Sequence, residues 1–291
     1  MKTLESFKIE NCKSAAEALE VTGNNWKTTE STLFDQFGNK ISTHKAIVRE
    51  DNHACLGIVG KDYQPMELTE SFDIFDNLLR EEKITLDSLK VFEGGKKVVY
   101  TSNLQSFDVQ ENDKLTPKMH IVQSFDGSKS YQVFFTMYRL VCTNGLVMAT
   151  DKSIMNIRHT ITMPQKVQFA EIALKNAFDY FDGMKQVTFE MVKTQINNDY
   201  TNHILDTIIG KSVNEDGTPK TRTINIKEQI LDLYVGGQGN NGRTKWDLYN
   251  SFTEYTTHYR GNEENREYSN LFGSGYELSK NAFNAIRTIA A

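Results

Sequence analysis

One stretch decides the fold: SFDGSKSYQVFFTMYRLVCTNGLVMATDKSIMNIRHT, residues 124–160. Its turn pair Asp126-Gly127 is a hairpin signal, because these residues tolerate the backbone angles of tight hairpin turns. The run 131–142 is rich in aromatic and β-branched residues and predicts a strand. A Cys-Thr-Asn-Gly break separates it from a second predicted strand, 154–160, which ends in Ile-Arg-His-Thr. The unit predicts an antiparallel sheet and contains no recognised catalytic motif.

The alternating pattern continues outward over residues 45–160. Apolar residues recur there at every second position, which predicts strands with one buried face. Besides the two strands above, the predicted strands are 46–50, 54–60, 96–104 and 118–125. The segment 68–79 breaks the pattern, because its apolar residues fall at helical spacing. We therefore predict a helix there, with Thr69 as its cap.

After Pro164 the apolar period changes to 3.6 residues, which predicts helices through to the C-terminus. Strands followed by helices are typical of an α+β fold rather than an alternating α/β fold. We expect a mostly antiparallel, twisted sheet with one inserted helix, and a helical C-terminal half packed on or beside it. The expected divisions are an N-terminal extension (1–43), a mainly β domain (44–163) and a helical region (164–291).

Composition limits the class of protein. The 291 residues are 38% hydrophobic, enough for a sizeable core, and no apolar run reaches the roughly 18 residues that span a bilayer. The N-terminal residues lack the apolar segment of a secretory signal, and the three cysteines are odd in number. These features favour a reduced, cytoplasmic protein with no membrane partner. Neither a metal site nor a cofactor is predicted, because no histidine or cysteine has a suitably spaced partner.

Two patterns bear on chemistry. Residues 237–242 read G-x-G-x-x-G, but the dinucleotide fingerprint needs a preceding strand and a βαβ unit, and the flanking pattern here is helical. We interpret the segment as a loop between helices. Cys142 and His159 could form a nucleophile and base, with Asn144 as orienter, if their strands are neighbours. The alternative is a buried cysteine beside a polar strand end.

Positive charge is concentrated in the middle of the chain. Residues 90–175 hold 11 lysines and arginines against 7 acidic residues, whereas the whole chain has a net charge of −5. Sheets that present aromatic rings beside basic residues bind single strands by stacking and phosphate contact. The candidate nucleic-acid-binding residues are Lys96, Lys97, Tyr100, Lys118, Lys129, Tyr131, Tyr138, Arg139, Lys152, Arg158 and His159. The alternative is that the aromatic residues of these strands belong to the core.

Several segments resemble a family of phage- and plasmid-borne proteins of unknown function. The matching pieces are LGIVGKDYQPMELTESFDIFDNLL (56–79), GGKKVVYTSNL (94–104), SFDGSKS (124–130), YRLVCTNGL (138–146), IRHT (157–160), TKWDLYNSFTEYTTHYRG (244–261) and LFGSGYELSKNAFNAI (271–286). The resemblance implies an origin on bacterial mobile elements, and so the cytoplasm of a bacterial host cell, and it brings no established activity. The order of strands before helices is also loosely similar to single-strand annealing recombination proteins of phages, a fold-level analogy.

Three functions are compatible with these observations. The first is a non-enzymatic nucleic-acid-binding protein of a phage or plasmid. It would bind or anneal single strands during recombination or replication. The second is a structural or host-interaction protein of a mobile element that binds no nucleic acid. The third is an enzyme with a Cys142/His159 centre. A homo-oligomer is compatible with all three.

Overall fold

The computed structural model describes residues 3–140, 144–146, 155–160, 183–211, 213–215, 217–218 and 220–290, and it has the expected α+β fold. The strands are β1 (Leu4–Lys8), β2 (Thr28–Phe34), β3 (Lys40–Arg49), β4 (Cys55–Gly60), β5 (Thr85–Phe92), β6 (Lys97–Asn103), β7 (Phe107–Gln110), β8 (Asp113–Ser124), β9 (Tyr131–Arg139), β10 (Asn144–Leu146) and β11 (Met155–Ile157). The helices are α1 (Ala15–Val21), α2 (Leu68–Phe72), α3 (Ile74–Arg80), α6 (Asn198–Ile209), α7 (Thr221–Gly236), α8 (Lys245–Glu254), α9 (Glu263–Phe272) and α10 (Ser274–Thr288). A 3-10 turn, η1 (Glu93–Gly95), and a π-helical turn, η2 (Tyr255–Tyr259), complete these elements, and residues 183–193 are also helical.

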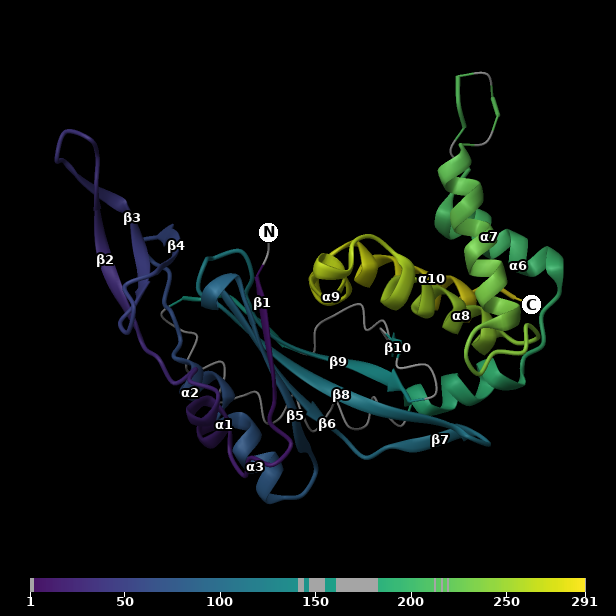
Figure 1. Cartoon of the computed structure of the whole chain (residues 1–291), viewed down its shortest axis with the longest axis horizontal. Coiled ribbons are helices and arrows are strands. Elements are labelled where there is room, and N and C mark those ends of the chain that lie inside the picture. The colour runs from purple at the N-terminus through teal and green to yellow at the C-terminus, as the bar shows by residue number, and fades with distance from the viewer. Residues whose placement is uncertain are drawn as a thin grey trace. The chain divides into compact units, whose positions relative to one another are not determined.

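The chain divides into two units, each built from separated segments. Unit 1 comprises Met1–Gln105, Lys118–Phe135 and Lys152–Phe178, and unit 2 comprises Ser106–Pro117, Thr136–Asp151 and Asp179–Ala291. Strands β8 and β9 contribute residues to both units. Most of the strands therefore belong to unit 1, and helices α6 to α10, green to yellow in Figure 1, belong to unit 2.

The larger of two sheets has the strand order β1-β5-β6-β8-β9-β10, with β7 paired to β8 and β11 paired to β9. Its hydrogen-bonded pairs include β5 with β6 and β6 with β8, both antiparallel. The second sheet, β2-β3-β4, is also antiparallel and lies in unit 1 (Figure 1, purple). The first 43 residues therefore supply strands to both sheets.

The core of unit 1 lies around β6, whose residues 97–102 are all buried. Helix α2 packs on this strand, because the Phe72 and Tyr100 rings have centroids 4.6 Å apart. The Tyr131 hydroxyl in β9 donates a hydrogen bond to the Ser71 carbonyl at 2.7 Å. The aromatic residues of these strands thus fill the space between sheet and helix, as one of the two sequence interpretations holds.

The core of unit 2 surrounds α8, in which every residue is buried. Trp246, Tyr249 and Phe252 lie three residues apart along this helix and are fully buried, and the helix packs against α7, α10 and β10. Thr244 caps the helix and forms a capping box with Asp247, because each side chain bonds the other's backbone N–H. The G-x-G-x-x-G segment that precedes this cap is a loop between α7 and α8, as predicted.

Most other differences from the sequence predictions involve short or exposed elements. The expected helix 68–79 is two short helices, α2 and α3, and Glu67 rather than Thr69 lies at the first N-terminus, so the predicted cap is wrong. Strands β1 and β2 are exposed along most of their length, so they lack the alternation that predicts a strand. The helix predicted directly after Pro164 lies largely outside the described residues. Within the described part of the chain, no helix is both long and apolar enough to cross a membrane.

Candidate functional site

Three of the residues predicted to bind nucleic acid meet at one pocket of unit 1. Lys129, Arg158 and His159 line a hollow of about 580 Å³ formed by the β8–β9 turn, the segment after β4 and the end of β11. We call this hollow the hairpin pocket. Further polar side chains in its lining are those of Asp62, Tyr63, Ser128, Ser130 and Asn156. A hollow of this volume is of the size that takes a small ligand or one unit of a chain.

The β8–β9 turn that forms one wall is fixed by Asp126. Its Oδ1 accepts hydrogen bonds from Ser124 Oγ at 2.7 Å and from the backbone N and Oγ of Ser128 at 3.0 and 2.7 Å. The buried Lys97 Nζ donates to Oδ2 at 2.6 Å. Burial alone would raise the pKa of Asp126, but the hydrogen bonds from Lys97, Ser128 and Ser124 outweigh it and lower the pKa to about 2. The carboxylate therefore stays ionised at neutral pH and holds the turn.

Two glycines allow β4 and this turn to approach closely. A Cβ on Gly57, in β4, would lie 2.5 Å from the Cα of Asp126. Gly127 in the turn has φ +72°, and a Cβ there would lie 3.2 Å from Val59 Cγ1 of β4. A side chain at position 57 would push the turn away from the strand, so the pocket wall depends on glycine there.

His159 is nearly buried, with 6% of its surface exposed, and its ring is held from two sides. The ring stacks on Tyr63 with centroids 4.8 Å apart and planes 27° apart. His159 Nδ1 lies 3.3 Å from the Gln64 carbonyl oxygen, and the Gln64 N–H donates to the His159 carbonyl at 3.2 Å. Because a carbonyl only accepts, Nδ1 carries the proton when the ring is neutral.

The other ring nitrogen of His159 has no such partner. Nε2 is buried and makes no hydrogen bond with any of the described residues. Burial lowers the pKa of His159 to about 4, although the hydrogen bond to Gln64 partly opposes this effect. The ring is therefore neutral at pH 7.

Among the described residues, the charges that line the pocket are net positive. Arg158 is exposed and Lys129 is half-buried, and Asp62 is the one acidic residue of this described lining. Both basic side chains suit a phosphate, since guanidinium and ammonium groups donate charge-assisted hydrogen bonds to its oxygens. The arrangement can thus hold an anionic group.

The structure places the predicted stacking tyrosines elsewhere. Tyr100 and Tyr131 are fully buried in the core of unit 1, and burial raises the pKa of both hydroxyls. Neither ring offers a face to a base in this fold, so the expectation that either is exposed does not hold. Tyr138, in unit 2, is half-buried.

The predicted lysines are also dispersed. Lys97 is buried against Asp126, and Lys118 Nζ lies 3.0 Å from a carboxylate oxygen of Asp87. Lys96 is half-buried. Lys152 lies outside the described residues, as does Cys142, the proposed nucleophile beside His159. Lys129 is thus the one described lysine of the predicted set that lines the hairpin pocket.

Arg139 is part of the core of unit 2 rather than a solvated phosphate contact. It is fully buried, and its Nε and Nη2 each lie 2.7 Å from a carboxylate oxygen of Asp113. The same guanidinium donates to the carbonyls of Gln238 and Gly239 at 3.1 and 2.8 Å, and to Asn240 Oδ1 at 3.0 Å. Its role is to fix the loop between α7 and α8, which occupies all of its hydrogen-bonding edges.

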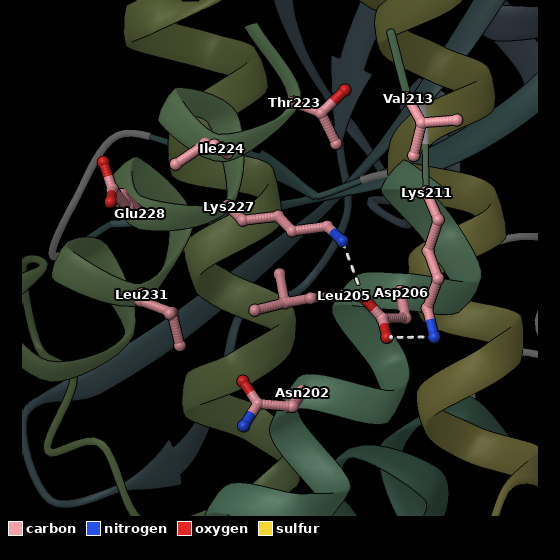
Figure 2. A pocket seen from close by; sticks show the side chains of 10 residues that line it. All are labelled: Asn202, Leu205, Asp206, Lys211, Val213, Thr223, Ile224, Lys227, Glu228 and Leu231. Carbon is pink, nitrogen blue, oxygen red and sulfur yellow. Dashed lines mark hydrogen bonds and ion pairs between the residues drawn. The ribbon is translucent and has the colours of Figure 1, made fainter. Parts of the chain in front are cut away.

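A second hollow, of about 410 Å³, lies between α6 and α7 in unit 2. Figure 2 shows Asp206 in its wall, paired with Lys227 at 2.6 Å and Lys211 at 3.1 Å. These two ammonium groups lower the pKa of Asp206 by hydrogen bonding. Because Lys227 and Lys211 are both paired with Asp206, this hollow is less suited to a charged ligand than the hairpin pocket.

Sequence reasoning missed part of the hairpin pocket. Tyr63, Ser128 and Asn156 line it and were not among the predicted binding residues. Tyr63 lies in the segment 56–79, one of those that resemble the phage and plasmid family. That resemblance was the sequence signal that could have pointed to Tyr63. No cluster of three potential metal-ligating side chains occurs within the described ranges.

The fold and the pocket together define an α+β protein with a small, net-positive polar pocket at a hairpin turn. Residues 55–274 match the family described as Domain of unknown function (DUF932), and the chain belongs to that family. The matched range contains every residue that lines the hairpin pocket. No curated protein and no solved structure matches the chain.

Proposed function

We propose that this protein binds single-stranded nucleic acid without catalysing a reaction on it, and that the hairpin pocket takes one nucleotide unit of the strand. The observation that carries the proposal is the meeting of Lys129, Arg158 and His159, three residues expected from sequence to bind nucleic acid, around one hollow. A cationic pocket of nucleotide size is what a sugar–phosphate unit requires.

Each part of the pocket has a role in this proposal. Arg158 and Lys129 neutralise a phosphate, and Arg158 is exposed enough to meet it without rearrangement. Tyr63, half-buried and stacked on His159, replaces Tyr100 and Tyr131 as the candidate stacking ring. A single strand is the expected form, because paired bases in a duplex hide the faces that such a ring contacts.

The biological setting follows from the resemblance to phage- and plasmid-borne proteins. The resemblance supports a role in the cytoplasm of a bacterial host, in recombination or replication of a mobile element, where single strands are exposed. Because the chain has a net charge of −5, its surface as a whole should not attract nucleic acid. The affinity should therefore come from the hairpin pocket.

The test is fluorescence anisotropy of a labelled single-stranded oligonucleotide at low salt. Arg158→Ala should weaken binding about five- to tenfold, as expected for loss of one phosphate contact. Lys40→Ala is the matched control, because this exposed lysine of β3 carries the same charge and does not line the pocket. Absence of binding by the parent, or equal effects of the two variants, would refute the proposal.

A protein-interaction role is the second candidate, and one observation favours it. Phe34 and Phe37, at the tip of the β2–β3 hairpin, are 61% and 79% exposed. Large exposed apolar side chains often mark a contact surface. The parent should then self-associate in analytical ultracentrifugation, and the double variant Phe34→Ser with Phe37→Ser should abolish this association. If both results are obtained and no oligonucleotide binds, this candidate replaces the first.

A further inference from the structure

We infer that unit 2 holds a second binding site, a pocket with three arginines that takes a small molecule carrying a phosphate monoester on an apolar body. The pocket has a volume of about 470 Å³ and is lined by residues of α6, α7, η2, α9 and α10. We call it the arginine pocket, after Arg222, Arg260 and Arg266 in its lining. Its described lining residues all belong to unit 2, whereas the hairpin pocket lies in unit 1, so this site goes beyond the proposed function.

The three guanidinium groups of the arginine pocket lack carboxylate partners. No Asp or Glu is among the described lining residues, and Arg222, Arg260 and Arg266 form no ion pair within the described part of the chain. By contrast, Arg139 in the same unit is paired with Asp113. Like charges around one hollow repel one another, and more strongly near protein than in open water. An anion is therefore the expected complement of this pocket.

Two of the arginines are held in place and still have open donors. The Arg260 N–H donates to the Tyr255 carbonyl across the π-helical turn at 2.8 Å, and its Nη1 donates to Ser274 Oγ at 2.7 Å. Nε and Nη2 of Arg266 donate to the carbonyls of Arg260 and Gly261 at 3.1 and 3.2 Å. The guanidinium nitrogens of both residues that make no hydrogen bond are not buried. A ligand can thus reach donors whose positions the fold fixes.

The number of arginines favours a phosphate monoester over other anions. A monoester carries about −1.5 to −2 charges at pH 7 and three terminal oxygens, so each oxygen can face one guanidinium group. A carboxylate has only two oxygens and a single charge, and each diester phosphate of a nucleic acid also has a single charge. Arg222 is exposed and makes no hydrogen bond with the described residues, so its guanidinium is free to meet the third oxygen.

The apolar part of the lining indicates what the phosphate is attached to. Four half-buried apolar side chains face the same hollow: Ile208, Ile209, Ile226 and Leu278. Covering such surface with an apolar part of a ligand removes it from water, which favours binding. The pocket therefore suits a phosphate that is attached to a ring or a short alkyl chain better than an inorganic phosphate ion.

The test is isothermal titration calorimetry of the full-length protein with phenyl phosphate, inorganic phosphate and phenyl sulfate. Phenyl phosphate combines the doubly charged phosphate with an apolar ring. Inorganic phosphate lacks the ring, and phenyl sulfate keeps the ring but carries a single charge. Phenyl phosphate should bind at least about tenfold more tightly than either of the others. A dissociation constant for phenyl phosphate above about 1 mM, or equal affinity for one of the other two probes, would overturn the inference.

Substitutions locate the bound phosphate. Arg222→Ala should weaken binding of phenyl phosphate about five- to tenfold, because one charge-assisted contact is lost, and this exposed position should leave the fold intact. Arg243→Ala is the matched control, because Arg243 is an exposed arginine of unit 2 outside the pocket lining, and its affinity should stay within about twofold of the parent's. An Arg222→Ala variant that binds like the parent contradicts the site. Equal weakening by Arg158→Ala and Arg222→Ala contradicts it too, since Arg158 lines the hairpin pocket.

Oligonucleotides separate the monoester from a nucleic-acid strand. A single strand with hydroxyl groups at both ends carries no monoester and should not displace phenyl phosphate. Displacement would assign the arginine pocket to the diester backbone and overturn the inference. Absence of strand binding refutes the proposed function and leaves this site standing, whereas absence of phenyl phosphate binding refutes this site and leaves the proposed function standing.

Discussion

At the scale of single residues, burial separates two arginines that look alike in sequence. Arg139 and Arg158 both lie near the ends of predicted strands in the basic segment. The first is fully buried in a two-point ion pair with Asp113, and the second is exposed at the hairpin pocket. The same residue type therefore stabilises unit 2 in one place and is free to meet a ligand in the other.

This contrast predicts opposite effects on stability. Arg139→Ala should lower the free energy of unfolding by about 3–5 kcal/mol, because Asp113 is left buried and unpaired. Arg158→Ala should change it by less than about 0.5 kcal/mol, as for most exposed positions. Urea unfolding of both variants measures the difference. Similar stability losses in the two would contradict the assignment of Arg139 to the core.

The buried histidines predict how stability depends on pH. Burial lowers the pKa of His159 from 6.5 to about 4, so between these values the unfolded chain takes up a proton that the folded chain does not. Stability present above pH 6.5 is therefore lost progressively as the pH falls toward 4. His120 acts in the same direction, because burial, with Lys90 and Lys118 nearby, lowers its pKa to about 3.

The contribution of His159 can be measured by substitution. Between pH 6.5 and 5 the parent should lose roughly 1.5 kcal/mol through this group, and His159→Phe should lose that much less over the same interval. Urea titrations at the two pH values provide the numbers. Asp126 does not interfere, since its lowered pKa acts only below its ordinary value of 3.8. Equal losses in parent and variant would show that His159 is not buried as a neutral ring.

At the scale of elements, the contact between β4 and the β8–β9 turn shapes the pocket. Gly57→Ala places a methyl group 2.5 Å from the Cα of Asp126, and backbone cannot yield as a side chain can. The variant should lose about 1–3 kcal/mol of stability, the usual range for overpacking. Gly60→Ala, in the same strand, meets nothing within 4 Å and should stay within about 0.5 kcal/mol of the parent. Thermal melting that ranks the two variants in the reverse order would contradict this packing.

Elements that depend on local signals could be predicted from the sequence. The Asp126-Gly127 turn, the Thr244 cap and the buried Trp246 face all follow from residues within one or two turns of each other. Strand β2 could not be predicted, because its residues are largely exposed and carry no alternation. The sequence predicted one helix over 68–79 where the structure has two, because no local signal marks the break at Asp73.

At the scale of the whole molecule, long-range packing decides which predicted site residues remain available. The Tyr131 hydroxyl donates a hydrogen bond to the carbonyl of Ser71, which lies 60 residues away in the chain. Arg139 is held by a loop about 100 residues away. Periodicity says nothing about such partners. By contrast, Lys129 and Arg158 come together because β11 pairs with β9 directly after the hairpin, with Ile157 opposite Tyr131. That pairing was foreseeable from the two adjacent predicted strands, whereas the arrival of Tyr63 from beyond β4 was not.

The salt dependence of single-strand binding measures whether the hairpin pocket holds a phosphate. Each phosphate neutralised on a single strand contributes a slope of about −0.7 to the plot of log affinity against log salt. Lys129→Ala combined with Arg158→Ala should therefore remove the one phosphate contact of the pocket, flatten the slope by about 0.7 and leave the melting temperature close to that of the parent. A double variant with the parent's slope and affinity would show that the hairpin pocket does not hold the phosphate, and would contradict the account.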